Sequence, residues 1–71
     1  MSGSKTVKMV MMDTDTSVKT LAEVFNKQPQ YISNKLLRNT WKVDDIKEWL
    51  DAMGADVVIK VRSTGHIFPL E

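Results

Sequence analysis

Three polar side chains within residues 26–39 have the types and the spacing that suit base recognition in DNA. Gln30, Ser33 and Asn34 lie three and four positions apart, so a helix would place them close to one face. Glutamine and asparagine amides can each donate to and accept from adenine in a bidentate manner, and serine can contact either kind of base pair. The plainer interpretation is that these side chains only keep a helix surface soluble. On an exposed helix they are predicted to contact bases.

A second set of side chains surrounds these three and suits the phosphate backbone. Basic and neutral polar groups bind phosphate oxygens, and such contacts position a protein on DNA without reading its sequence. The candidates are Lys19, Lys27, Gln28, Tyr31, Lys35, Arg38 and Asn39. Each also has a plainer interpretation, because surface helices commonly carry solvated charges and Tyr31 could brace the helix instead.

The charge along the chain is uneven, although the formal net charge is only +1. Residues 17–40 contain four basic residues and one acidic residue, which gives a local charge of +3. Residues 41–56 contain two basic and five acidic residues, which gives −3. Such asymmetry indicates that one face meets an anionic partner, although scatter in a short sequence would produce the same numbers.

The sequence lacks the usual patterns of catalytic and metal sites. It contains no cysteine, which excludes disulfides, thiolate zinc sites and thiol nucleophiles, and which favours a reducing, cytoplasmic location. Residues 13–17 begin like a calcium loop, but Val18 and Val24 stand where that loop requires glycine and glutamate. His66 has no acid nearby, and the apolar run at residues 9–12 is too short for a membrane span. We therefore expect no enzyme activity, no cofactor, no metal and no small-molecule substrate.

Apolar periodicity predicts the helices that would position these side chains. Four helices are expected at about residues 5–14, 17–25, 29–37 and 43–53. Residues 1–4 are expected to be a flexible start, with Ser4 as a cap of the first helix. The last helix should bury a stripe that runs from Val43 to Met53, and both Trp41 and Trp49 are expected in the core.

The predicted helix ends depend on a few residues with special backbone preferences. Ser17 or its neighbour is a good N-cap for the second helix, and Asn26 tolerates the left-handed conformation that ends it. Pro29 then begins a helix instead of breaking one, because proline is favoured at the first helical position. Gln28 is a mediocre N-cap, and Gly54 is expected to end the last helix.

After Gly54 the sequence changes to β-branched residues. A strand is predicted at residues 57–61, a turn at 62–65, and a second short strand at 66–68. A lone two-stranded hairpin is marginal in water. We therefore expect it to pack on the helices, to pair with another chain, or both. The residues predicted to contact a second chain are Val57, Ile59, Val61, Ile67 and Phe68.

Residues 17–39 resemble the helix-turn-helix of Cro and phage-repressor-type regulators, the XRE family. The resemblance depends on apolar and turn positions at Leu21, Ala22, Phe25, Asn26, Ile32 and Ser33. The end of the last helix and the strand after it are similar to short family members that end in a β-strand, so the resemblance extends over about residues 5–68. Pro29 occupies a position where relatives often place a base-contacting side chain, which moves the expected contacts to Gln30, Ser33 and Asn34.

The resemblance implies a mainly α fold: a four-helix bundle with a central, lambda-repressor-like helix-turn-helix and a C-terminal β-strand or hairpin. Residues 5–54 would be the DNA-binding domain, and residues 55–71 would be a dimerisation element. The implied function is a homodimeric transcriptional regulator, a repressor, that reads double-stranded DNA with residues 29–37. One alternative is a protein-interaction module with the same fold and no DNA binding. Another is an antitoxin or excision factor that binds DNA.

Overall fold

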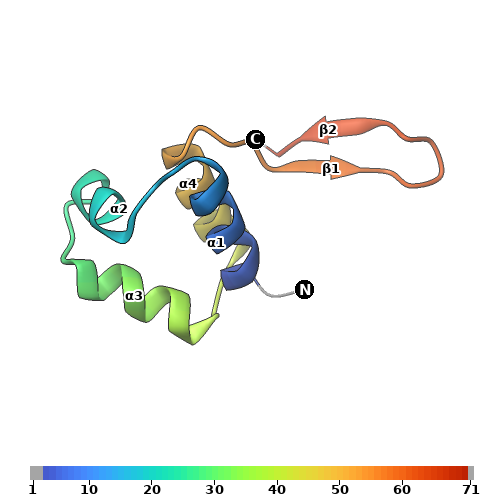
Figure 1. Ribbon diagram of the computed structural model, residues 1–71. Coiled ribbons are helices and arrows are strands. Elements are labelled where there is room, and N and C mark those ends of the chain that lie inside the picture. The colour runs from blue at the N-terminus through green and yellow to red at the C-terminus, as the bar shows by residue number, and fades with distance from the viewer. Residues whose placement is uncertain (1–2, 71) are drawn as a thin grey trace.

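The computed structural model describes residues 3–70, which form four helices followed by a two-stranded antiparallel sheet (Figure 1). The elements are α1 (Gly3–Asp13), α2 (Val18–Val24), α3 (Pro29–Arg38), α4 (Val43–Ala52), β1 (Val58–Lys60) and β2 (Ile67–Pro69). The mainly helical character and the C-terminal hairpin predicted from the sequence are thus confirmed. Within the described residues, no helix is long and apolar enough to cross a membrane.

Helix α1 begins earlier than the sequence predicted. Gly3 and Ser4 are helical, and Ser4 is buried instead of capping a helix that starts near Lys5. Ser4 N donates a 3.0 Å hydrogen bond to Asn39 Oδ1, and Trp41 Nε1 donates one of 2.8 Å to Ser4 Oγ. A Cβ on Gly3 would lie 2.7 Å from Trp41 Cδ1, so only glycine fits there. The flexible segment predicted at residues 1–4 is therefore wrong for residues 3–4, and residues 1–2 lie outside the described part.

The residues predicted to begin and end α2 and to begin α3 do so in the structure. Ser17 has an extended backbone, and its hydroxyl accepts a hydrogen bond from Thr20 N at 3.1 Å. Asn26 has a φ of 54°, the left-handed conformation expected of it. Pro29 stands at the start of α3, and Gln28 is an N-cap without a side-chain hydrogen bond. The proline therefore marks a helix boundary, as predicted.

The core lies where the four helices meet. Its buried residues are Val7, Met11, Leu21, Ala22, Ile32, Leu36 and Trp49. Trp49 is buried as predicted, and Trp41 packs against it edge-on with ring centroids 4.8 Å apart. An aromatic pair of this kind contributes about 0.5–1.5 kcal/mol beyond its buried area. Val43 was expected in the buried stripe of α4, but its side chain is 61% exposed because it stands at the first position of the helix.

The C-terminal hairpin projects from the helical body (Figure 1). Its strands pair Val58 with Pro69, Ile59 with Phe68 and Lys60 with Ile67. Among the elements of residues 3–70, neither strand makes extensive contact with a helix, and only the base of the hairpin approaches the end of α4. Of the two expectations, packing of the strands on the helices is therefore not observed.

The register of the hairpin places the residues that were predicted to contact a second chain on two different faces of the sheet. Directly paired residues share a face, and faces alternate along a strand. Ile59 and Phe68 therefore lie on one face together with Val57 and Val61, while Ile67 lies on the other face opposite Lys60. Ile67 is thus the one residue of the five predicted contacts that lies on the other face of the sheet. A single sheet face can use only the other four.

Candidate nucleic-acid interface on helix α3

The outward face of α3 is the surface on which the predicted base-contacting residues lie. Ile32 is fully buried and Leu36 is 8% exposed, so these two side chains attach α3 to the core. Gln30, on the other side of the helix, is exposed, whereas Ser33 and Asn34 are half-buried. Figure 1 shows α3 at the periphery of the molecule, with α2 above its first turns in this view. The three side chains are accessible from outside on one rigid helix.

Gln30 and Asn34 form a linked amide pair. Gln30 Nε2 donates a 2.9 Å hydrogen bond to Asn34 Oδ1, the i, i+4 geometry of neighbours on a helix surface. This bond uses one hydrogen of Gln30 and one lone pair of Asn34. Each amide has further capacity, because the Gln30 carbonyl can still accept and the Asn34 nitrogen can still donate two hydrogens. The pair is thus ordered and keeps both kinds of group for a ligand.

A polar hollow lies beside this amide pair. It is lined by Tyr31, Asn34, Lys35, Arg38 and Thr40 and has a volume of about 340 Å³. The phenol, the amide and the guanidinium can all donate hydrogen bonds to an anionic oxygen. Lys27, from the turn before α3, lies 5.3 Å above the Tyr31 ring, which adds a third cation to Lys35 and Arg38 near this side of the helix.

Lys35 has partners inside the protein, which the sequence did not indicate. Lys35 Nζ lies 3.0 Å from Asp45 Oδ2 and is 3.4 Å from the Thr40 carbonyl oxygen, to which it donates. It also stands 5.1 Å above the Trp41 ring. The hydrogen bond from Lys35, and next the one from the Lys42 backbone N–H, lower the pKa of Asp45 below its ordinary value. Lys35 connects α3 to α4, and its predicted phosphate contact would compete with this ion pair.

The other residues predicted to contact phosphate differ in their exposure and in their hydrogen bonds within the protein. Asn39 is the residue whose side chain accepts from Ser4 N, so it caps the start of α1. Lys19 on α2, Gln28 before α3 and Arg38 in its last turn are exposed. With Lys27, these three are exposed residues of α2, of α3 and of the turn between them. They are the side chains best placed to meet a backbone of negative charge.

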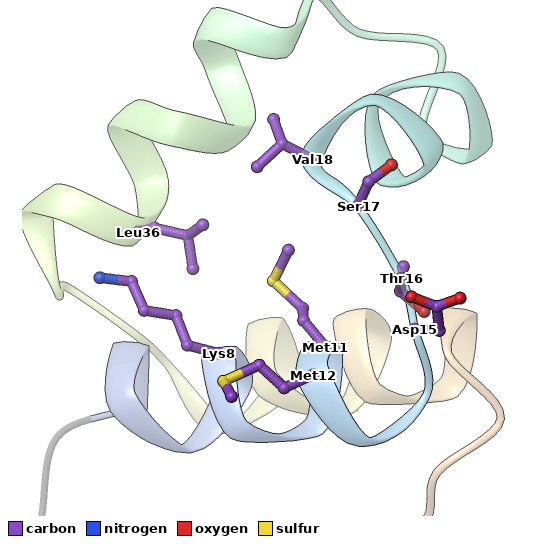
Figure 2. A pocket seen from close by; sticks show the side chains of 8 residues that line it. All are labelled: Lys8, Met11, Met12, Asp15, Thr16, Ser17, Val18 and Leu36. Carbon is purple, nitrogen blue, oxygen red and sulfur yellow. The ribbon is translucent and has the colours of Figure 1, made fainter.

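An apolar groove between α1, α2 and α3 was missed by the sequence analysis. Figure 2 shows Met11, Val18 and Leu36 pointing toward one another across it, with Lys8 and Met12 on the α1 side. Its volume is about 510 Å³. Met12 follows the buried Met11 directly and is 81% exposed, because successive side chains of a helix point in different directions.

Beside this groove, Leu37 is 78% exposed and Met9 is 61% exposed. Together with Met12 they form an apolar patch next to the last turn of α3. Leu37 already stands out in the sequence, because it is an apolar residue on the otherwise polar outward side of α3. Within residues 3–70, no group of three or more histidine, aspartate or glutamate side chains could hold a metal ion.

Comparison of the chain with protein-family models, with curated proteins and with solved structures found no match. The resemblance to Cro-type regulators therefore stays a prediction from the sequence. The function has to be argued from the amide pair of α3, the cations around it, and the exposed hairpin.

Proposed function

We propose that this protein binds double-stranded DNA in a sequence-specific manner and regulates transcription as a repressor. The observation that carries the proposal is the hydrogen-bonded amide pair of Gln30 and Asn34 on the outward face of α3. In this interpretation α2, the turn and α3 form a helix-turn-helix, and α3 enters the major groove. The major groove admits one α-helix and presents a distinct donor and acceptor pattern for each base pair. Two amides with free donors and acceptors suit adenine.

The proposed phosphate contacts come from α2, from the turn after it and from the last turn of α3. Lys19 would approach one strand from α2, while Lys27 and Arg38 would do so from the two ends of α3. Each neutralised phosphate releases counterions, so the affinity should fall steeply as salt rises. The backbone N–H groups at the start of α3, with Gln28 before them, add neutral contacts. Lys35 is a weaker candidate, because Asp45 already neutralises its charge.

A homodimer is part of the proposal, because one short helix reads few base pairs. Helix α3 has ten residues, which corresponds to a length of about 15 Å. Two copies on half-sites one helical turn apart would roughly double the free energy of recognition. The exposed apolar residues of the hairpin support such an association, since Ile59 is 53% exposed and Phe68 is 54% exposed. A repressor would then act by occluding a promoter.

The test replaces both amides. A binding site is first selected from random duplexes, and the Gln30→Ala, Asn34→Ala double variant is then compared with the unchanged protein in gel shifts. Each bidentate contact to a base contributes about 1–3 kcal/mol of discrimination, so the preference for the selected site should fall at least tenfold. Weak, salt-sensitive binding should remain because the phosphate contacts are intact. Val43→Ala, at an exposed position of α4, is the control. A double variant that keeps full preference would show that α3 is not the reading helix.

A protein-interaction module is the second candidate, and two observations favour it. The hairpin exposes apolar side chains, and the apolar groove and the patch at Met9, Met12 and Leu37 could receive a protein. Titration with a random duplex at low salt distinguishes the two candidates. A DNA-binding protein must show affinity that weakens as salt is added, whereas no affinity at low salt would favour the interaction module. An antitoxin or an excision factor would use the same DNA-binding surface as a repressor.

A further inference from the structure

The two outer edges of the hairpin differ in their backbone hydrogen-bonding groups. Val61 N donates to His66 O and Leu70 N donates to Val57 O, both at 2.9 Å, so these two pairs are hydrogen-bonded inside the ladder. Hydrogen-bonded and non-hydrogen-bonded pairs alternate in an antiparallel ladder. The backbone groups directed toward the outer edges therefore belong to Val58 and Lys60 on β1 and to Ile67 and Pro69 on β2.

Pro69 has no backbone N–H, so the outer edge of β2 lacks one of its donors. On β1 both Val58 and Lys60 present a donor and an acceptor. An exposed edge of this kind is a template for another strand. The free edge of β1 is thus the better site for strand addition. A second copy of the chain supplies a strand that matches it.

We propose that β1 pairs antiparallel with β1 of a second copy, with Ile59 facing Ile59 of that copy at the two-fold axis. The result is a four-stranded sheet in which the two β1 strands are central. Three or more strands are needed for a sheet to be stable in water, and four strands meet this requirement. The inference specifies the interface of the homodimer included in the proposed function, and it does not depend on DNA binding.

Residues 56–62 make four kinds of cross-strand pair in this register. Three of them match in character, and the fourth places Val58 opposite Lys60 on the other face of the sheet. With Ile59 at the axis, Val57 faces Val61 and Asp56 faces Arg62 of the other chain. Opposite charges and apolar pairs directly across strands are favourable, and like charges are not. On the apolar face, Phe68 flanks Ile59 in each hairpin, so the stripe continues across the interface.

The neighbouring registers are less favourable. The outward backbone groups belong to alternate residues of β1, so one β1 strand can slide along the other only in steps of two residues. Such a step moves the two-fold axis by one residue, either to Lys60 or to Val58. An axis at Lys60 places two lysines directly opposite each other. An axis at Val58 moves the pairing toward α4, so that Val61 faces Ala55 and Arg62 faces Gly54, which has a φ of 76° where the chain turns. The axis at Ile59 avoids both conflicts.

Single cysteines test the register, because the chain contains none of its own. In the proposed sheet the two Ile59 residues form a non-hydrogen-bonded pair with Cα atoms about 4.5 Å apart, close enough for a disulfide. Ile59→Cys should therefore give a covalent dimer on mild oxidation, measured on a non-reducing gel. Phe68→Cys is the matched control, since it lies on the same face with a similar exposure but belongs to β2. Lys60→Cys and Val58→Cys report the other two registers. Stronger cross-linking of any of these three variants than of Ile59→Cys would overturn the proposed register.

A pair of prolines tests which edge is used. Lys60 and Ile67 face each other in the hairpin, and the backbone N–H of each is directed outward, so proline at either position leaves the ladder bonds intact. Sedimentation should show that Lys60→Pro is monomeric at concentrations where Ile67→Pro is still a dimer. If Lys60→Pro stays dimeric, the homodimer stands and the β1 edge is wrong. If the unchanged protein is monomeric at high concentration, both the homodimer and this interface are wrong, while DNA binding is unaffected by either result.

Discussion

At the scale of single residues, Lys35 shows how a contact inside the protein changes the role expected of a side chain. The sequence places it on the outward flank of a basic helix, which is typical of a phosphate contact. The folded chain brings it to Asp45, ten positions away, and to the ring of Trp41. The side chain of Lys35 is 21% exposed, so water screens this ion pair less than one at the open surface. The residue therefore holds the end of α3 against the start of α4.

The same ion pair predicts how acid affects stability. The pKa of Asp45 is lowered in the folded protein, so its ionised form stabilises the fold at neutral pH. This contribution is lost as the pH falls below the ordinary aspartate value of 3.8 and through the lowered pKa. In Lys35→Met the pKa of Asp45 should rise toward the ordinary value, measured by a carboxyl NMR titration.

Lys47→Met is the control for that titration, because Lys47 pairs with Asp51 and not with Asp45. It should leave the pKa of Asp45 unchanged. Thermal unfolding at a series of pH values should show that the difference in stability between the unchanged protein and Lys35→Met shrinks as the medium becomes more acidic. A difference that stays constant with pH would mean that the Lys35–Asp45 contact contributes nothing through charge.

At the scale of the elements, the three connections between the helices share one backbone feature. Each of the three links from α1 to α4 contains a non-glycine residue with left-handed backbone: Asp15, Asn26 and Asn39, with φ between 52° and 54°. Asparagine and aspartate tolerate this conformation better than other side chains. From the sequence, this role was predicted for Asn26 only. Asn39 carried the same local signal, an asparagine directly after a basic last helical turn.

Glycine substitutions separate the backbone role of these residues from their side-chain role. Asn26→Gly should change stability by less than about 0.5 kcal/mol, because glycine adopts the same backbone readily and loses some entropy on folding. Asn39→Gly should destabilise the protein by about 1–2 kcal/mol, because the buried N–H of Ser4 loses its acceptor. Urea unfolding followed by tryptophan fluorescence measures both. Equal effects at the two positions would show that the cap at Ser4 contributes little.

Helix boundaries that depend on local chemistry were predictable, and those that depend on distant contacts were not. Ser17, Asn26 and Pro29 act on their own neighbours, so propensity and capping rules placed both ends of α2 and the start of α3 to within about one residue. The start of α1 depends on Trp41, more than thirty positions away, and no local pattern contains that information. The position of Ile67 depends on strand register, where one residue of difference moves a side chain to the other face.

In the candidate site, too, some features were predictable from the sequence and others were not. Residue type and spacing predicted an exposed amide pair at Gln30 and Asn34, since both follow from helical geometry. The bond between the two amides, and the ion pair that occupies Lys35, depend on side-chain conformation and on α4. The apolar patch at Met12 was equally hidden, because its exposure depends on how α1 packs against α3.

At the scale of the whole molecule, the described chain is elongated, with extents of 42 × 22 × 20 Å. The helices contain the buried core, and the hairpin provides much of the length (Figure 1). The two parts are therefore stabilised differently: the helices by their own packing, and the hairpin by its ladder and the strand that we propose to join it. Amide hydrogen exchange in the hairpin should slow as protein concentration rises, whereas exchange in the helical core should not change.

Pro69 has a consequence for how many chains can join. A sheet that accepts strands on both edges grows without limit and forms fibres, whereas a sheet with one usable edge is complete after a single addition. Because Pro69 lies on the outer edge of β2, the four-stranded sheet would end in a proline-bearing strand on each side. Pro69→Val should therefore yield particles larger than a dimer, detected by light scattering and thioflavin fluorescence, while Leu70→Val should not. If Pro69→Val stays dimeric, other features terminate the growth of the sheet. If Pro69→Val forms larger particles, the pyrrolidine ring of Pro69 is what protects the protein from amyloid-like polymerisation.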